Sequence, residues 1–242
     1  MNAARSRGRI AQVHPPVVRE PAPAAPGRFI TFEGGEGAGK STQVRRLRER
    51  LGALGIDAVA TREPGGSTGA EIVRHLILSG AAKPLGPLAE AALFAAARAD
   101  HLDATIRPAL ERGSWVICDR FADSTRVYQG VLGNVDPRLI AELEAVTVGE
   151  TRPDLTLVLD LPAEEGLTRA AARSGAGADR FESESLSFHR SLRDAFRNLA
   201  AREPERCVLI DARADIDTVA EEVWRAVADR LQPPAPAGIG PT

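Results

Sequence analysis

Residues 34–42 read Gly34-Gly35-Glu36-Gly37-Ala38-Gly39-Lys40-Ser41-Thr42, which is a complete match to the phosphate-loop pattern G-x-x-x-x-G-K-[ST]. In such a loop the glycines let the backbone turn its amide groups inward around the phosphates of a nucleoside triphosphate. Lys40 can reach the terminal phosphates, and the hydroxyl of Ser41 can ligate Mg²⁺. The motif therefore predicts that the chain binds ATP or GTP.

The segments on either side of this loop have the periodicity that a phosphate loop requires. The apolar run Phe29–Phe32 precedes it and is typical of a buried strand. Residues 43–54 follow it, with apolar side chains at helical spacing at Val44, Leu47, Leu51 and Leu54. A glycine-rich loop can match the pattern by chance, but strand, loop and helix occur here in the required order, which favours a functional phosphate loop.

Composition and charge limit the classes of partner. The chain has 242 residues, of which 43% are hydrophobic and 26% are charged, as in a globular protein with one sizeable core. Its 31 basic and 33 acidic residues give a formal net charge of −2, so no global charge attracts nucleic acid or anionic lipid. No run of 18 apolar residues occurs. We therefore expect neither a nucleic-acid partner nor a membrane association.

Cysteine and histidine usage favours a reduced protein without a transition metal. Cys118 and Cys207 both lie in apolar runs, so we expect buried thiols rather than a disulfide, which fits a cytoplasmic location. The histidines have no metal-ligand spacing. They are His14, His75, His101 and His189.

The two ends of the chain have low-complexity compositions. Residues 1–27 are rich in Pro, Ala and Arg, and residues 233–242 consist mostly of Pro, Ala and Gly. The arginines of the first segment faintly resemble an organellar transit peptide, but its prolines would break an amphipathic helix. We expect two disordered tails and one folded domain that spans residues 28–232.

Short β-like runs alternate with longer segments of helical periodicity along the folded part. The runs are Phe29–Phe32, Ala58–Thr61, Trp115–Cys118, Leu155–Leu159 and Val208–Ile210. This alternation predicts an α/β fold with a doubly wound, parallel, five-stranded sheet flanked by helices on both faces. Ligands of such sheets bind beyond the carboxyl ends of the strands.

Charged residues follow each predicted strand, where they would point toward the phosphate loop. They are Glu33, Arg62-Glu63, Asp119-Arg120, Asp160 and Asp211. Strands normally end in polar residues, so each of these alone is a weak signal. Asp119 is the strongest candidate, because an apolar strand that ends in a carboxylate commonly holds Mg²⁺ beside a phosphate loop.

An arginine-bearing connector is the predicted source of further positive charge. Phosphoryl transfer spreads negative charge over the migrating group, and the phosphate loop itself contributes only Lys40. Residues 169–182 carry Arg169, Arg173 and Arg180 around a flexible Ser/Gly/Ala stretch. Such a segment suits a lid that closes over ATP and excludes water, although it could also be a solvated loop between two helices.

The class of acceptor follows partly by exclusion. The guanine-reading element Asn-Lys-x-Asp of G-protein switches does not occur in the sequence. The sensor elements of ring-shaped ATPases are not recognisable either. A small-molecule kinase remains the leading hypothesis, and a regulatory ATPase whose arginine-rich connector binds a protein is the alternative of a different class.

Four motifs together resemble bacterial thymidylate kinases of the type whose catalytic arginine lies in the lid. They are Phe32–Thr42, Thr61-Arg-Glu-Pro-Gly-Gly66, Phe94-Ala-Ala-Ala-Arg98 and Asp119-Arg-Phe-Ala-Asp-Ser-Thr-Arg-Val-Tyr-Gln-Gly130. The resemblance runs from about Phe29 to Ala226. It implies the P-loop nucleoside-monophosphate kinase fold, a homodimer, and ATP- and Mg²⁺-dependent conversion of dTMP to dTDP in dTTP synthesis. Another nucleoside or nucleoside-monophosphate kinase of the same fold stays open as the closest alternative.

The resemblance also implies which residues hold the nucleoside of dTMP. Phe94 resembles the aromatic residue that stacks on thymine, although a lone phenylalanine is more often part of a core. Arg98, one helical turn later, resembles the donor to the O4 acceptor of the base. Thr125 matches the position that bonds the N3 edge, with Ser124 beside it, and Tyr128 resembles the ring that crowds the sugar 2′ position. The same motifs add Glu63, Pro64 and Gln129 to the predicted substrate site.

Phosphate and metal roles are implied in the same way. Arg74 and Arg120 resemble the pair that grips the acceptor monophosphate, a task suited to a forked guanidinium. Glu36 resembles the carboxylate that meets the sugar 3′-hydroxyl. Asp119 and Glu33, together with Ser41, are the candidates for binding Mg²⁺ or its water shell.

The lid arginines are the least certain part of the predicted site. Arg173 best matches the catalytic arginine of the family, Arg180 follows closely, and Arg169 can instead support the helix end. The chain departs from many relatives in having Ala171 where they have a basic residue, and in a slightly longer loop at residues 175–178. The assignment among the three arginines therefore stays open. The predicted catalytic set is Lys40, Arg120, Asp119 and Arg173, and the predicted ATP site is residues 34–42 with Arg169 and Arg180.

Overall fold

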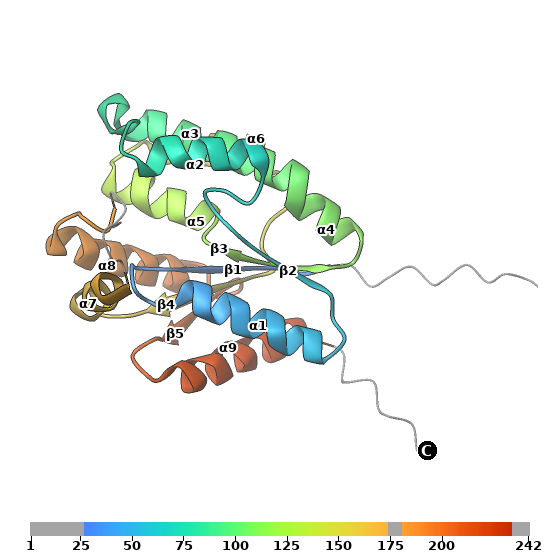
Figure 1. Ribbon diagram of the computed structural model, residues 1–242. Helices are drawn as coiled ribbons and strands as arrows, with labels where there is room; N and C mark the ends of the chain where they lie inside the picture. The colour runs from blue at the N-terminus through green and yellow to red at the C-terminus, as the bar shows by residue number, and fades with distance from the viewer. Residues whose placement is uncertain (1–26, 174–180, 234–242) are drawn as a thin grey trace, which may run out of the picture.

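The structure is a computed structural model that describes residues 27–173 and 181–233. Its centre is a sheet of five strands in the order β2-β3-β1-β4-β5, and every neighbouring pair in it is parallel (Figure 1). The strands are β1 (Phe29–Gly34), β2 (Ala58–Arg62), β3 (Trp115–Asp119), β4 (Leu155–Asp160) and β5 (Cys207–Asp211). The predicted doubly wound α/β fold is confirmed, and each predicted strand differs from the observed one by no more than two residues at either end.

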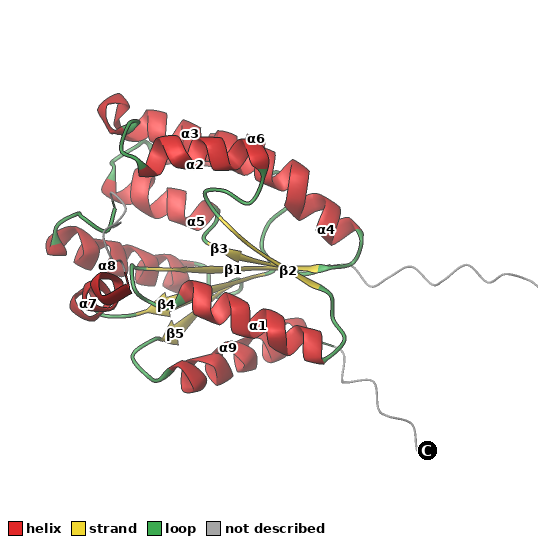
Figure 2. Ribbon diagram, viewed as in Figure 1, coloured by secondary structure: helices red, strands yellow, loops and turns green. Residues whose placement is uncertain are grey.

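Helices cover both faces of the sheet (Figure 2). One face is covered by α1 (Lys40–Ala53) and α9 (Ile216–Leu231). The other face and its surroundings carry α2 (Thr68–Leu78), η1 (Lys83–Leu85), α3 (Gly86–His101), η2 (Leu102–Ile106), α4 (Arg107–Glu111), α5 (Ala122–Thr125), η3 (Arg126–Leu132), α6 (Pro137–Thr147) and α8 (Leu186–Arg202). Helix α7 (Ala163–Arg173) follows β4 and packs on α8.

Alternation along β1 explains why both faces need a helical cover. Ile30 and Phe32 are fully buried and pack in one cluster with Leu47 of α1 and Val223 of α9. Phe29 points to the opposite face and meets the edge of the Phe121 ring, with the centroids 4.9 Å apart. A strand that is apolar on both faces is stable only when both are covered, so the sheet is sandwiched between helical layers.

Cysteine burial agrees with the sequence as well. Cys118 and Cys207 are free thiols, both buried, on β3 and β5. Burial raises the pKa of Cys207 to about 12, so this thiol stays protonated and unreactive near neutral pH. The predicted tails coincide almost entirely with residues 1–26 and 234–242, which lie outside the described residues, so the prediction that they are disordered stays a prediction.

Candidate active site

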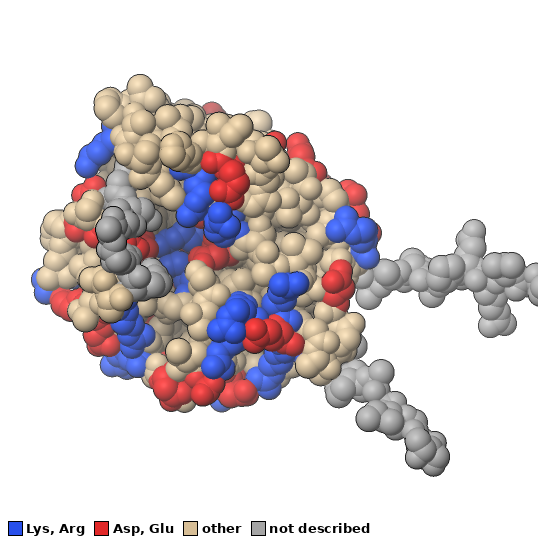
Figure 3. Space-filling view, in the orientation of Figure 1, with Lys and Arg blue, Asp and Glu red and all other residues tan. Residues whose placement is uncertain are grey.

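A cavity of about 270 Å³ opens at the carboxyl ends of β1, β2 and β3. The space-filling view shows basic side chains inside a hollow of this face (Figure 3). The residues that line the cavity are Glu36, Gly37, Gly39, Lys40, Ser41, Arg62, Glu63, Pro64, Arg74, Leu78, Phe94, Arg98, Asp119, Arg120, Phe121, Ser124, Thr125, Tyr128, Gln129, Phe181 and Glu182. The structure thus brings the phosphate loop and the predicted nucleoside-binding residues together around one space.

Gly37 of the phosphate loop has no room for a side chain. Gly37 has φ 67°, and a Cβ atom there would lie 2.0 Å from the backbone oxygen of Gly166 in α7. The contact is reciprocal, because a Cβ on Gly166 would lie 2.4 Å from the backbone oxygen of Glu36. The loop therefore packs backbone to backbone on the start of α7.

Lys40 is folded onto the loop that carries it. Its Nζ donates to the backbone oxygens of Gly35 at 2.8 Å and Gly34 at 3.2 Å. The residue is 7% exposed, and burial together with the nearby Arg120 lowers the pKa of Lys40 below its usual range. The ammonium group lies where phosphates of a nucleotide in the loop could replace the two carbonyl acceptors.

Ser41 and Asp119 form the oxygen pair beside the loop. The Ser41 hydroxyl donates to Asp119 Oδ2 at 2.5 Å, and both residues line the cavity. Carboxylate and hydroxyl oxygens are the hard ligands that Mg²⁺ prefers, and this cation commonly uses one or two protein oxygens plus substrate phosphates. The pair therefore fits a Mg²⁺ ion that is completed by nucleotide oxygens.

Glu36, Arg120 and Tyr128 form a charged cluster beside Lys40, because Arg120 and Lys40 donate to the same backbone oxygen of Gly34. Arg120 Nη2 and the Tyr128 hydroxyl each donate to Glu36 Oε1 at 2.7 Å, and Arg120 Nη1 donates to the Gly34 backbone oxygen at 3.1 Å. Burial alone would raise the pKa of Glu36, but Arg120 and Lys40 outweigh it and lower this pKa to about 2. Glu36 is therefore ionised at neutral pH, and among the described residues none donates to its second oxygen.

Backbone geometry aims Arg120 at this cluster. Its φ of 69° lies in the left-handed region, which a side chain other than glycine seldom occupies. The Arg120 amide donates to the Phe32 backbone oxygen at 2.8 Å, which anchors the residue to the end of β1. Strained backbone of this kind is typical of functional positions.

A second polar group surrounds Arg98 at the predicted base site. Arg98 Nε donates to Glu63 Oε2 at 2.8 Å, and its Nη2 donates to Thr125 Oγ1 at 3.1 Å. The guanidinium carbon lies 5.1 Å from the centre of the Phe121 ring. Arg98 is 3% exposed, so this group is a fixed donor in the cavity wall rather than a mobile surface charge.

Aromatic rings line the cavity near this donor. The centroid of Phe181 lies 6.5 Å from that of Phe94 and 5.3 Å from that of Tyr128. All three residues line the cavity, so flat apolar surface faces the space beside Arg98. Arg74 lies on the same wall, where its Nη1 donates to the Pro64 backbone oxygen at 2.6 Å.

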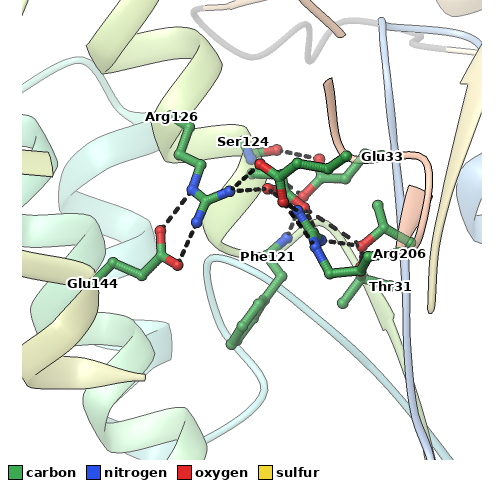
Figure 4. A network of polar contacts seen from close by, with 10 residues as sticks. Thr31, Glu33, Phe121, Ser124, Arg126, Glu144 and Arg206 are labelled. Carbon is green, nitrogen blue, oxygen red and sulfur yellow. Dashed lines mark hydrogen bonds and ion pairs between the residues drawn. The ribbon is translucent and has the colours of Figure 1, made fainter. Parts of the chain in front are cut away.

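Glu33 is placed apart from the cavity, unlike the other two residues of the predicted metal set. Its side chain is fully buried and accepts from the backbone amides of Phe121 at 2.8 Å and Ser124 at 3.2 Å, and from the Ser124 hydroxyl at 2.7 Å. Figure 4 shows this carboxylate beside the polar network beneath α5. Three donors occupy it, so we assign Glu33 to holding the start of α5 and no longer propose it as a metal ligand.

The network in Figure 4 ties α5 to three other parts of the fold. Asp123 is 2% exposed and accepts from Arg206 Nη1 at 2.7 Å. Arg126 reaches Asp123 at 3.3 Å and forms a bidentate pair with Glu144 at 2.6 and 2.7 Å. Arg206 also donates to Thr156 Oγ1 at 2.6 Å. These bonds fix the helix that carries Ser124 and Thr125 against the sheet.

Replacing Glu33 with glutamine should change how stability depends on pH. Burial and the nearby Asp123 raise the pKa of Glu33 from 4.5 to about 7. The folded chain therefore binds this proton more tightly than the unfolded chain, so the stabilisation is complete below pH 4.5 and is lost as pH rises through 7. Glu33→Gln keeps an acceptor for the two amides but cannot ionise. We therefore compare the free energy of unfolding of the variant with that of the wild type at each pH. From pH 4.5 to above pH 8, this difference should shift in favour of the variant by up to about 3 kcal/mol.

Urea unfolding of both proteins from pH 4.5 to pH 8.5 measures this difference. The comparison cancels titrating groups that the two proteins share. A difference in the free energy of unfolding that stays constant over the whole range would contradict the raised pKa of Glu33.

Other predicted residues lie away from the cavity or outside the described residues. Arg169 Nη1 donates to the Ala212 backbone oxygen at 3.0 Å, so this side chain supports the loop after β5. Asp160 is held by Arg193 at 2.6 and 2.9 Å, and Asp211 by Arg213 at 2.6 Å. The side chain of Arg173 and all of residues 174–180, Arg180 included, lie outside the described residues.

Several cavity residues were not in the predicted site. Phe181 and Glu182 line it at the end of the predicted lid segment 169–182, and Arg62, Leu78 and Phe121 complete the wall. The sequence placed Arg62 after a predicted strand, pointing toward the phosphate loop, but assigned it no role. Phe121 lies within the motif that begins at Asp119, next to the predicted residue Arg120. Leu78 is the last residue of α2 and carried no sequence signal.

Comparisons with known proteins agree on one family. The sequence model of the family described as thymidylate kinase matches residues 32–223. The thymidylate kinase of Nitrobacter winogradskyi is 65% identical over 205 residues, which cover 84% of this chain and 89% of the relative. That of Bradyrhizobium diazoefficiens is 63% identical over 88% of this chain and 93% of the relative.

A solved structure gives the same result in three dimensions. The crystal structure of thymidylate kinase from Ehrlichia chaffeensis aligns with a TM-score of 0.69 at 33% sequence identity. The alignment covers 84% of this chain and 100% of that one. With a phosphate loop and an arginine-lined cavity at the carboxyl ends of a parallel sheet, the chain belongs to the thymidylate kinase family.

Proposed function

We propose that this protein transfers the γ-phosphoryl group of ATP to dTMP and so forms dTDP for dTTP synthesis. One observation carries the proposal: a single cavity joins the phosphate loop to Arg98 and an aromatic wall. ATP and a pyrimidine monophosphate can therefore face each other across one space. The family to which the chain belongs supports thymine as the base.

The reaction needs positioned charge more than acid–base chemistry. An oxygen of the acceptor phosphate attacks the γ-phosphorus in line, and because that oxygen is already ionised, no general base is required. Lys40 would follow the transferred group, while Arg120 and Arg74 would hold the acceptor phosphate from the other side. Glu36, which stays ionised, would accept from the sugar 3′-hydroxyl through its second oxygen.

Base recognition would use the wall around Arg98. Its guanidinium would donate to the O4 oxygen of thymine, Thr125 would bond the N3 edge, and Phe94 would stack on the ring. Tyr128 would crowd the 2′ position of a ribose. The remaining predicted contacts, Pro64, Ser124 and Gln129, line the same cavity.

Mg²⁺ would be held by Ser41 and Asp119 together with nucleotide oxygens. When bound, the ion neutralises charge on the phosphates during transfer. The described residues contain no group of three or more His, Cys, Asp or Glu side chains that could hold a metal by themselves. That finding fits a cation that is shared with the nucleotide.

Arg173 would supply the lid arginine, with Arg180 as the alternative. Arg173 ends α7, and the predicted lid follows it directly. Arg169 is engaged with the backbone after β5, which favours Arg173 over Arg169 for a role at the transferred phosphoryl group. Comparing kcat of Arg173→Ala and Arg180→Ala would identify the dominant arginine.

A substrate comparison tests the proposed function. ADP formation is measured with ATP, Mg²⁺ and one of dTMP, dUMP, dCMP or dAMP, and the products are separated by chromatography. We expect dTMP to give the highest kcat/KM, with dTDP as the product. A clear preference for another base would favour a different monophosphate kinase. Release of free phosphate without dTDP would favour a regulatory ATPase.

We also propose a homodimer, which the family resemblance implied. Exposed apolar side chains on α2 and α6, which both pack on α3, support it (Figure 1). These side chains are Ile72, Leu76, Leu139 and Val146. Sedimentation of the wild type should give twice the 25.7 kDa chain mass, and a monomer at micromolar concentration would refute the dimer.

A cytoplasmic location completes the proposal. Both cysteines are buried free thiols, as expected in a reducing compartment. Among the described residues, we find no helix with the length and apolar character needed to cross a membrane.

A further inference from the structure

His101 is a buried histidine behind the cavity wall rather than in it. It ends α3, is fully buried, and does not line the cavity. Its Nδ1 lies 3.1 Å from Glu63 Oε1, and its Nε2 lies 2.7 Å from Thr61 Oγ1. A carboxylate only accepts hydrogen bonds, so Nδ1 carries the proton and donates to Glu63. In the neutral ring Nε2 then accepts from the Thr61 hydroxyl.

Glu63 connects this ring to Arg98. One oxygen accepts from His101 and the other accepts from Arg98 Nε at 2.8 Å, so the carboxylate is held from both sides. Glu63 is 6% exposed, and neither bond is shared with bulk water to any large extent. The histidine is therefore one of the two groups that set the orientation of the carboxylate plane.

Arg98 has one terminal nitrogen left for a ligand. Its Nε is bound to Glu63, and its Nη2 donates to Thr125 Oγ1 at 3.1 Å. No hydrogen bond from Nη1 to a described residue occurs, and Arg98 lines the cavity. A guanidinium is planar, so fixing Nε and Nη2 also fixes the direction in which Nη1 donates. That direction depends on Glu63 and, through Glu63, on His101.

We propose that His101 is a positioning residue for base selection. Through its Nδ1 bond it orients Glu63, which aims Arg98 at a base that carries a carbonyl oxygen at position 4. The inference rests on the proposed function, since it assigns the selectivity of that site. A thymine O4 accepts from a fixed donor, whereas the amino group of cytosine presents a donor to it. The quantity at stake is the ratio of kcat/KM for dTMP to that for dCMP.

A purely structural role for His101 is the competing explanation. A Cβ atom on Gly66 would lie 2.4 Å from His101 Nε2, so the ring also packs under the turn that follows Pro64. Loss of the ring could disturb this turn without any effect that passes through Glu63. The experiment must therefore separate the bond at Nδ1 from the bulk of the side chain.

Two amide substitutions make this separation. The amide nitrogen of asparagine is as many bonds from Cβ as Nδ1, so His101→Asn keeps the donor to Glu63 and loses the Thr61 contact. The amide of glutamine reaches the position of Nε2, so His101→Gln keeps the Thr61 contact and more of the bulk but loses the donor to Glu63. His75→Asn, which alters an exposed histidine of α2, is the matched control.

We expect His101→Asn and the control to keep the wild-type ratio to within about 3-fold. His101→Gln should lower the ratio by about 10-fold or more, through a higher KM for dTMP, with the KM for ATP unchanged. A packing role predicts that glutamine is tolerated at least as well as asparagine. The proposal would therefore be overturned if His101→Asn lost as much selectivity as His101→Gln, or more. A loss confined to kcat would overturn it as well.

A double-mutant cycle with Glu63→Gln provides a second, independent test. If His101 acts through Glu63, His101→Gln should add little to the loss of selectivity that Glu63→Gln causes alone. Additive losses would overturn the proposal. If a variant fails to melt cooperatively, the dissociation constants of dTMP and dCMP are measured for His101→Asn and for the wild type. The proposal requires that both proteins prefer dTMP to dCMP by the same factor. A wild type that does not prefer dTMP to dCMP would instead refute the proposed function.

Discussion

Replacing Lys40 with methionine is expected to lower kcat by on the order of 10³ while the protein stays folded. The ammonium group is the cation that the phosphate loop itself offers to the transferred phosphoryl group, and cations placed there contribute about 10³-fold or more. Within residues 27–173 and 181–233, Nζ bonds only to the backbone oxygens of Gly34 and Gly35, so its removal breaks no ion pair among them. Turnover at saturating ATP and dTMP measures the effect.

The chain supplies its own control for this experiment. It contains two lysines, and the second, Lys83, is 66% exposed and pairs with Glu184 on the surface. Lys83→Met should change kcat by less than 2-fold, because an exposed pair of this kind contributes about 1 kcal/mol or less to stability and does not line the cavity. Equal losses in the two variants would mean that Lys40 does not act on the phosphates.

Replacing Arg120 with methionine should have the largest effect on folding stability. Arg120 forms the buried ion pair with Glu36, and the two side chains are 16% and 13% exposed. Removing one partner of a buried pair leaves the other charge uncompensated, which costs about 3–5 kcal/mol. Chemical denaturation at pH 7 should show this loss, and kcat/KM for dTMP should fall because the acceptor phosphate loses its guanidinium.

A double variant separates the two effects of Arg120. Glu36→Gln together with Arg120→Met removes both charges, so most of the lost stability should return while activity stays low. If the double variant is as unstable as Arg120→Met alone, the charge left on Glu36 is not the cause. Recovered activity in the double variant would contradict a role for Arg120 at the substrate.

Local patterns predicted the fold almost completely. Each strand was an apolar run bounded by polar residues. The order of strand, loop and helix around Gly39 and Lys40 predicted that the ligand site lies at the carboxyl ends of the strands. The glycine loop and the Asp119 position follow from neighbours in the sequence. For the same reason the predicted membership of the thymidylate kinase family, which rested on four local motifs, is confirmed.

Side-chain contacts between segments that are far apart in the chain could not be predicted from the sequence. Glu33 lies at the carboxyl end of β1 and Glu63 directly follows β2, yet Glu33 turns beneath α5 and Glu63 reaches the cavity. The packing of α3 and α5 decides which of the two carboxylates enters the cavity. His101 carried no spacing signal because its partners, Thr61 and Glu63, are about 40 residues away in the chain. Arg169 lies on the same helix as Arg173, but the guanidinium of Arg169 donates to the backbone oxygen of Ala212 in the loop after β5.

The backbone contact between Gly37 and Gly166 limits which substitutions this protein can accept. Neither position has room for even a methyl group, since each would drive a carbon into the main chain opposite. A substitution at one position cannot be offset by trimming the other, because both are already the smallest residue. Two positions far apart in the gene therefore both have to remain glycine. Directed evolution of specificity for the phosphoryl donor must leave this backbone contact unchanged.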